Sequence, residues 1–160
     1  MSPHFRFAWS ILLIASLSLL AVPGAFGQSD KAHIDYRQKV MKSIGANIGA
    51  IGDILKNKLP LGGNIAGHAE NIGRNAEMIA SAFEKRITAG PTDSKPAIWE
   101  NSSKFQGAAD DLVTAAKGVA KAAGMSDAGA IGAAMKKLGE SCKACHKDFR
   151  KPKEESFKKK

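Results

Sequence analysis

Two cysteines and a histidine lie close together near the end of the chain, at Cys142, Cys145 and His146. An α-helix advances about 100° per residue, so Cys145 would lie about 60° to one side of Cys142 and His146 about 40° to the other. All three side chains would then share one face of a helix. Two thiols at this spacing can form thioether bonds to one edge of a porphyrin, while the imidazole reaches the iron as its proximal ligand. The pattern therefore predicts one covalently attached haem c.

Three other uses of such a cysteine pair fit the sequence less well. A thioredoxin-like redox pair lies at the start of a helix after a strand, whereas this pair lies near the end of a chain without strand patterns. A zinc site needs four ligands, and His33 and His68 are distant in the sequence and have no paired spacing. A disulfide between two cysteines three residues apart on a helix would be strained.

The first 27 residues differ in composition from the rest of the chain, with one strong cation, no acidic residue and a central apolar run. These features are typical of a signal peptide, and the small residues Ala25 and Gly27 stand at the positions that signal peptidase requires. Cleavage would leave a mature domain, residues 28–160, that begins at Gln28. A membrane anchor is disfavoured because the apolar run is shorter than the roughly 18 residues of a spanning helix. We therefore expect a periplasmic protein without stable membrane insertion after cleavage.

Apolar residues recur at intervals of three and four in four stretches, which is the pattern of amphipathic helices, and no stretch alternates as a strand would. The predicted helices cover about 30–58, 64–85, 102–123 and a final stretch that follows Ser126 and includes Phe149. Pro60 would end the first helix, Gly124 would stop the third in the C-terminal glycine position, and Ser126 would cap the fourth.

Four helices of this length can bury their apolar faces only against each other, so the sequence predicts an all-α, antiparallel up-down-up-down four-helix bundle with one covalently bound haem. The one long link comprises residues 88–95, and Pro96 follows at a turn or helix start. Within the first helix, Gly45, Gly49 and Gly52 each cost up to about 1 kcal/mol relative to alanine. Either a flat ligand against the backbone or close helix packing would explain these glycines.

Three segments of the chain resemble the cytochrome c′ and cytochrome c-556 family: residues 36–42, residues 96–99 and residues 141–150, which contain the attachment motif. The motif near the C-terminus is the specific part, because most soluble cytochromes c carry it near the N-terminus. The resemblance covers essentially the whole mature chain. It implies a four-helix bundle with the haem between the helices, and it implies that a homodimer could form through the first two helices.

The resemblance also implies roles for single residues. Arg37 matches an arginine near a haem propionate, Gln38 a contact at the haem edge, and Arg150 an arginine on the proximal side. Met41 corresponds to a methionine that ligates the iron in some low-spin members and stays unbound in some high-spin members. The plain alternatives are a surface arginine at Arg37, an exposed glutamine at Gln38 and a space-filling methionine at Met41.

Other conspicuous side chains are assigned to packing or to the surface. The aromatic residues expected in the core or against the haem are Phe83, Trp99, Phe105 and Phe149. His68 lies beside the apolar face of its helix, and His33 lies near the N-terminus, so neither is favoured as a second iron ligand.

Charge and composition narrow the classes of function. The formal net charge is +9, and basic residues crowd the C-terminal end, where they could steer an acidic partner or form a solvated tail. Nucleic-acid binding is disfavoured because stacking aromatic residues are scarce.

A haem with two protein ligands suits a one-electron carrier, whereas a haem held by His146 alone would bind small gases such as nitric oxide. We expect an electron carrier that meets redox partner proteins, with gas binding as the alternative, and no enzyme.

Expression with a c-type cytochrome maturation system should yield a red protein that begins at Gln28 and keeps its haem through acid and organic extraction. Alanine at Cys142 or Cys145 should leave little holoprotein, because the attached group fills a core that glycine- and alanine-rich helices would pack poorly. Intact mass and the absorption of the extracted protein measure both effects. Haem that can be extracted, or no haem at all, would contradict the hypothesis.

Overall fold

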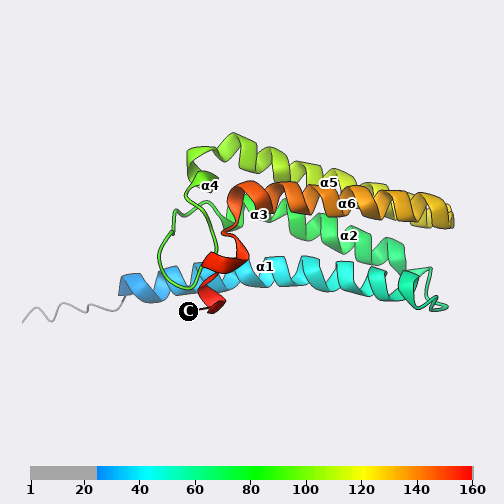
Figure 1. The fold of residues 1–160 in the computed structure, drawn as a ribbon, viewed down its shortest axis with the longest axis horizontal. Helices are drawn as coiled ribbons and strands as arrows, with labels where there is room; N and C mark the ends of the chain where they lie inside the picture. Colours follow the sequence, from blue (N-terminus) through cyan, green and yellow to red (C-terminus); the bar gives the residue numbers. More distant parts are fainter. Residues whose placement is uncertain (1–24, 160) are drawn as a thin grey trace, which may run out of the picture.

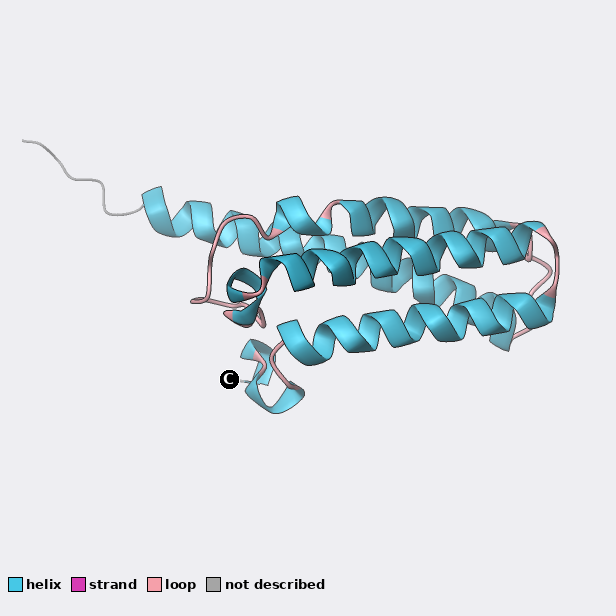
Figure 2. Ribbon diagram, turned by 90° about the horizontal axis from the view of Figure 1, so that it is seen from above, coloured by secondary structure: helices cyan, strands magenta, loops and turns pink. Residues whose placement is uncertain are grey.

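The computed structural model describes residues 25–159, which form helices and loops and contain no strand within that range (Figure 2). The elements are α1 (Ala25–Lys56), α2 (Asn64–Glu77), α3 (Ile79–Ala82), α4 (Ala97–Glu100), α5 (Ser102–Gly124), α6 (Ala128–Phe149) and two 3₁₀ turns, η1 (Lys153–Glu155) and η2 (Phe157–Lys159). None of the described helices is long and apolar enough to cross a membrane. Most of the predicted signal peptide lies outside the described residues, so its cleavage stays a prediction.

The predicted helix over residues 64–85 is divided at Met78 into α2 and α3. The Met78 amide donates to the carbonyl of Asn75 at 3.2 Å, which closes a tight turn, and the Ala82 amide donates to the carbonyl of Met78 at 3.0 Å. The Ser81 hydroxyl also donates to the Met78 carbonyl, at 3.1 Å. The helical path therefore resumes after one tight turn and ends at Ala82, earlier than the apolar pattern predicts.

The turn between α5 and α6 also differs from the prediction. α5 ends at Gly124 as expected, but the left-handed residue is Ser126, with φ of 54°, and not the glycine. Asp127 caps α6, because its Oδ1 accepts hydrogen bonds from the amides of Gly129 at 2.9 Å and Ala130 at 3.0 Å. The prediction that Ser126 caps the fourth helix is therefore wrong. A carboxylate at this position satisfies two free amides and interacts favourably with the helix dipole.

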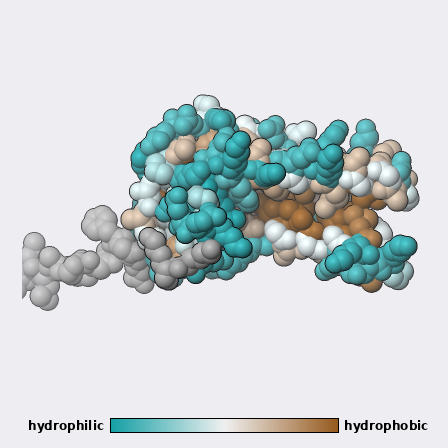
Figure 3. All heavy atoms as spheres, viewed as in Figure 1, coloured by the Kyte–Doolittle hydropathy of each residue, from teal (hydrophilic) through white to brown (hydrophobic). Residues whose placement is uncertain are grey.

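α1, α2, α5 and α6 form the predicted antiparallel four-helix bundle, in which α1 packs against α2, α2 against α5 and α5 against α6 (Figure 1). The largest fully buried side chains come from all four helices and are Ile51, Ile65, Ile72, Val119 and Leu138. Among the described helices, α1 and α6 do not make comparable backbone contact. The fourth side of the bundle is therefore open, and Figure 3 shows apolar side chains in the hollow between these two helices.

The long connection over residues 88–95 is held against the end of α6. The Lys95 amide donates to the carbonyl of Phe149 at 3.0 Å, and Ser94 forms an isolated antiparallel bridge with Arg150. Gly90 has φ of 84°, a left-handed conformation, and a Cβ at this position would lie 3.4 Å from Cδ1 of Ile34 on α1. Glycine therefore lets the loop approach α1 closely, and the loop covers one end of the hollow.

Candidate functional site

A cavity of about 380 Å³ lies on the open side of the bundle. α6 contributes Cys142, Cys145 and His146 to its lining, and α1 contributes Met41. Residues that are far apart in the chain thus share one cavity because α1 and α6 stand beside each other without closing the bundle.

The two cysteines of this cavity are half-buried, and both thiols are free. Burial raises the pKa of the Cys142 thiol. Burial, with further contributions from Cys142 and Asp148, raises the pKa of the Cys145 thiol to about 11. Both thiols are therefore protonated at neutral pH, which is unlike the depressed pKa of a reactive dithiol pair. Among the described residues, no group of three or more His, Cys, Asp and Glu side chains could hold a metal ion.

His146 lines the cavity, and the residue remains partly accessible to solvent. Partial burial of the imidazole lowers its pKa, and the charge of Arg150 lowers it further. The imidazole is therefore neutral at neutral pH and keeps a nitrogen lone pair, which is the form that ligates iron.

Arg37 is buried, with a side chain only 3% exposed. Its Nε donates to the carbonyl of Ala82 at 2.8 Å, and its Nη2 donates to the carbonyl of Lys85. The guanidinium also packs over the rings of Phe83, at 4.8 Å, and Trp99, at 5.4 Å. Burial lowers its pKa, an effect that the charge of Asp30 opposes. The alternative of a surface arginine is therefore wrong.

One nitrogen of Arg37 differs from the others. Nη1 is buried and has no hydrogen-bond partner in the protein, although the side chain lines the cavity. A buried cationic donor without an acceptor is unfavourable, and an anionic oxygen would satisfy it with a charge-assisted hydrogen bond. A carboxylate on a bound group, such as a haem propionate, would supply that oxygen.

Three phenylalanines form the aromatic side of the cavity. The rings of Phe83 and Phe105 meet edge to face at 5.2 Å, and those of Phe105 and Phe149 meet in the same way at 5.1 Å. All three residues line the cavity. Trp99 lies behind them and donates from Nε1 to the carbonyl of Phe83 at 2.7 Å. These residues pack as the sequence predicted, and they give a flat ligand an apolar surface.

The α1 wall holds Met41, which is half-buried and packs against the core, one turn after Arg37. Gly45 lies a further turn along and also lines the cavity. A Cβ at Gly45, Gly49 or Gly52 would meet nothing within 4 Å, so close helix packing does not explain these glycines. Gly45 leaves room above the cavity, which fits the flat-ligand explanation. The other two have no explanation in the structure.

Gln38 and Arg150 lie at the rim. The Gln38 side-chain amide donates to the carbonyl of Pro91 at 2.9 Å, and Arg150 forms an ion pair with Asp93 in which Nη2 lies 3.5 Å from Oδ2. Both side chains also line the cavity. Gln38 is therefore not a freely exposed glutamine. Its hydrogen bond to Pro91 joins the long loop to α1, and its side chain also lines the cavity.

The structure leaves two histidines out of the site and adds residues that the sequence did not single out. Nδ1 of His68 lies 2.9 Å from Oδ1 of Asn47, and neither His68 nor His33 lines the cavity. Besides further residues of the helices, the long loop and the C-terminal segment contribute the lining residues Thr92, Asp93, Ser94, Phe157 and Lys158. These residues follow no helical periodicity, and a single aromatic residue in a basic tail was the one sequence signal for them.

The residues present fit a covalently attached haem. Two cysteine thiols, a neutral imidazole, a methionine thioether and three phenylalanines line one cavity, together with Arg37, whose Nη1 has no hydrogen-bond partner. The volume also lies in the range of about 300–1,000 Å³ that is usual for sites of small molecules and cofactors.

Known proteins resemble this chain over most of its length. A family model described as Cytochrome C′ matches residues 32–150. A cytochrome c′ of Pararhodospirillum photometricum is 36% identical over 76% of this chain and 98% of that protein. A cytochrome c-556 of Agrobacterium tumefaciens strain B2A is 31% identical over 73% of this chain and 95% of that protein. The solved nitric oxide complex of a cytochrome c prime variant from Alcaligenes xylosoxidans superposes with a TM-score of 0.69 at 25% identity, covering 78% of this chain and 97% of that one.

Replacing Arg37 with alanine should lower the free energy of unfolding of the holoprotein by about 2–4 kcal/mol, because two backbone carbonyls lose their donor and the ring contacts are lost. Arg37→Lys should not recover the lost stability, since lysine lacks the planar guanidinium that donates to both carbonyls. Arg74 is the matched control: its ion pair with Glu70, at 3.3 Å, is exposed, so its removal should cost no more than about 0.5 kcal/mol. Urea unfolding measures all three variants, and equal losses for Arg37 and Arg74 would contradict the structural role.

Proposed function

Because the chain belongs to the cytochrome c′ family, we propose that it is an exported periplasmic haem protein that carries one electron at a time. Members of this family hold one covalently attached c-type haem. In this chain Cys142 and Cys145 would form the thioether bonds, and His146 would be the proximal ligand of the iron. Arg37 would bind a propionate through its unpartnered Nη1.

The observation that carries the proposal is that Met41 and His146 line the same cavity from different helices. A haem with a histidine and a methionine ligand changes its oxidation state by one electron with little rearrangement. The neutral imidazole suits ligation, and the Met41 thioether is held on a rigid helix. The surrounding phenylalanines and isoleucines would keep water from the group, as a carrier requires.

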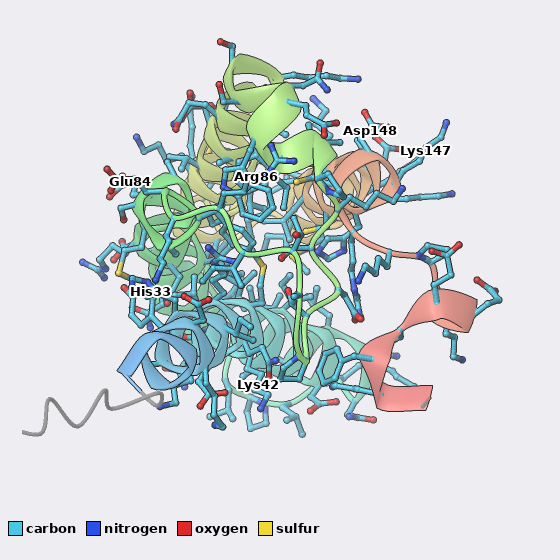
Figure 4. The ribbon with its side chains drawn as sticks, turned by 90° about the vertical axis from the view of Figure 1, so that its left-hand side faces the viewer. His33, Lys42, Glu84, Arg86, Lys147 and Asp148 are labelled. Carbon is cyan, nitrogen blue, oxygen red and sulfur yellow. The ribbon has the colours of Figure 1, made fainter. Side chains whose placement is uncertain are left out.

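The charge around the cavity supports a partner of opposite sign. Lys42, Arg150 and Lys158 all line the cavity, and Lys147, which follows His146 on α6, is exposed at the end of the molecule that faces the viewer in Figure 4. Clustered cations raise the rate at which an acidic protein approaches in the correct orientation. We infer that an acidic redox partner docks at this end, over the exposed side of the site.

A second function, the binding of a small gas, rests on the same methionine. Met41 is only half-buried, and an unbranched, flexible side chain can fill space above an open iron without binding it. The solved relative from Alcaligenes xylosoxidans is a nitric oxide complex. In that case Met41, Ile44 and Ile48 would form an apolar wall beside an open coordination position.

The spectrum of the purified protein distinguishes the two functions. Ligation by Met41 predicts a low-spin spectrum with a sulfur-to-iron charge-transfer band near the red edge, and Met41→Ala should abolish that band and make slow carbon monoxide binding fast. Met135→Ala is the control, because Met135 packs against the core but does not line the cavity. A wild-type protein that is high-spin and takes up nitric oxide rapidly would establish gas binding in place of electron transfer.

Docking of an acidic partner predicts electron-transfer rates that fall steeply as ionic strength rises, since charges are screened beyond about 8 Å at physiological salt. Lys42→Gln and Lys147→Gln should slow transfer severalfold at low salt, whereas Lys117→Gln, on the exposed side of α5, should not. Stopped-flow reduction with an acidic and a basic redox protein measures this difference. Electron-transfer rates that do not change with ionic strength, or equal effects of all three variants, would contradict docking at this end.

A further inference from the structure

The C-terminal segment, residues 151–159, begins where the match to the family model ends. It is not a free tail. It contains η1 and η2, and Ser156 between them is only 7% exposed. Figure 4 shows the segment leaving the end of α6 and descending toward the level of α1.

A single residue of the long loop, Asp93, holds this segment at both ends. Its backbone carbonyl accepts a hydrogen bond from the Lys151 amide at 2.7 Å. Its Oδ2 accepts one from the Ser156 hydroxyl at 3.0 Å, and its Oδ1 accepts one from the Phe157 amide at 3.0 Å. The ion pair with Arg150 adds a fourth contact, and the Asp93 side chain is only 12% exposed. The carboxylate thus forms a latch between loop and segment.

The latch places the segment against the cavity. Phe157 and Lys158 line it together with Thr92, Asp93 and Ser94. The loop is in turn tied to α1 by the hydrogen bond from Gln38 to Pro91 and to α6 by the bond from Lys95 to Phe149. Loop and segment therefore span the gap between the two helices at one end of the open side.

We propose that residues 151–159 form a lid over the edge of the haem, which Asp93 keeps closed and in which Phe157 is the cover. The inference rests on the proposed haem site, but it holds for a carrier and for a gas binder alike. Phe157 is the one large apolar side chain of the segment, and it turns toward the cavity while four of its neighbours are charged lysines and glutamates that stay exposed. Asp93 and Phe157 are positioning residues, since they act on the haem environment and not on the iron.

The lid has a measurable effect on the haem. Water near a haem stabilises its more highly charged oxidised form, so a closed apolar cover raises the reduction potential. Removing the cover should therefore lower the potential without removing the haem. Breaking the Asp93 hydrogen bonds should also lower the potential, and it should let the backbone amides of the segment exchange faster with solvent.

The experiment uses the holoprotein and measures hydrogen exchange of the amides of residues 151–158 together with the reduction potential. Asp93→Ala should speed exchange in the segment by about tenfold or more, because charge-assisted hydrogen bonds to a largely buried carboxylate are lost. Asp110→Ala is the control, since that carboxylate bonds only the exposed side chain of Gln106 at 2.9 Å. It should leave the segment and the potential unchanged.

Phe157→Ala separates the cover from the latch, because the Phe157 amide still bonds Asp93 when the ring is gone. It should lower the potential with little change in exchange, and Phe157→Leu should restore most of the potential. The lid is overturned if the wild-type amides exchange at unstructured rates, if Asp93→Ala does not speed exchange, or if Phe157→Ala leaves the potential unchanged. A colourless wild-type protein would instead overturn the haem site itself, so the two failures can be told apart.

Discussion

The apolar surface between α1 and α6 is the constraint on which the structure depends. Three sides of the bundle are closed by helix packing, but the fourth leaves isoleucines, phenylalanines and a methionine facing a hollow (Figure 3). Apolar surface of this kind is unfavourable in water unless something covers it. A flat, apolar group attached to one wall and anchored at its anionic end satisfies this surface, and the haem of the cytochrome c′ family is such a group.

The position of α1 relative to that group depends on Arg37. One side chain joins α1 to the carbonyls of Ala82 and Lys85, and it stacks on Phe83 and Trp99, which support the aromatic side of the cavity. The same residue keeps a nitrogen free inside the site. The same side chain therefore both joins α1 to the segment after α3 and presents an unpartnered donor within the residues that line the cavity.

The long loop and the C-terminal segment lie together at one end of the hollow. They meet there through Asp93, and Lys42, Arg150 and Lys158 line the same cavity. A carrier needs its haem edge near the surface for its partner yet shielded from water, and a gas binder needs a guarded opening. The proposed cover by Phe157 would meet either need.

The bundle and the attachment motif could both be predicted from the sequence. Apolar spacing defined four helices and hence the bundle, and the spacing of Cys142, Cys145 and His146 placed them on one helical face, because local geometry alone decides which residues of a helix lie together. Turn details were less certain, as the Asp127 cap and the break at Met78 show, since several residues there could make competing local hydrogen bonds. Only the packed structure shows that Arg37 is buried, that Met41 lines the same cavity as the motif, and that Asp93 bonds the Phe157 amide beside that cavity. These contacts join residues far apart in the chain, and no local periodicity encodes where such segments meet.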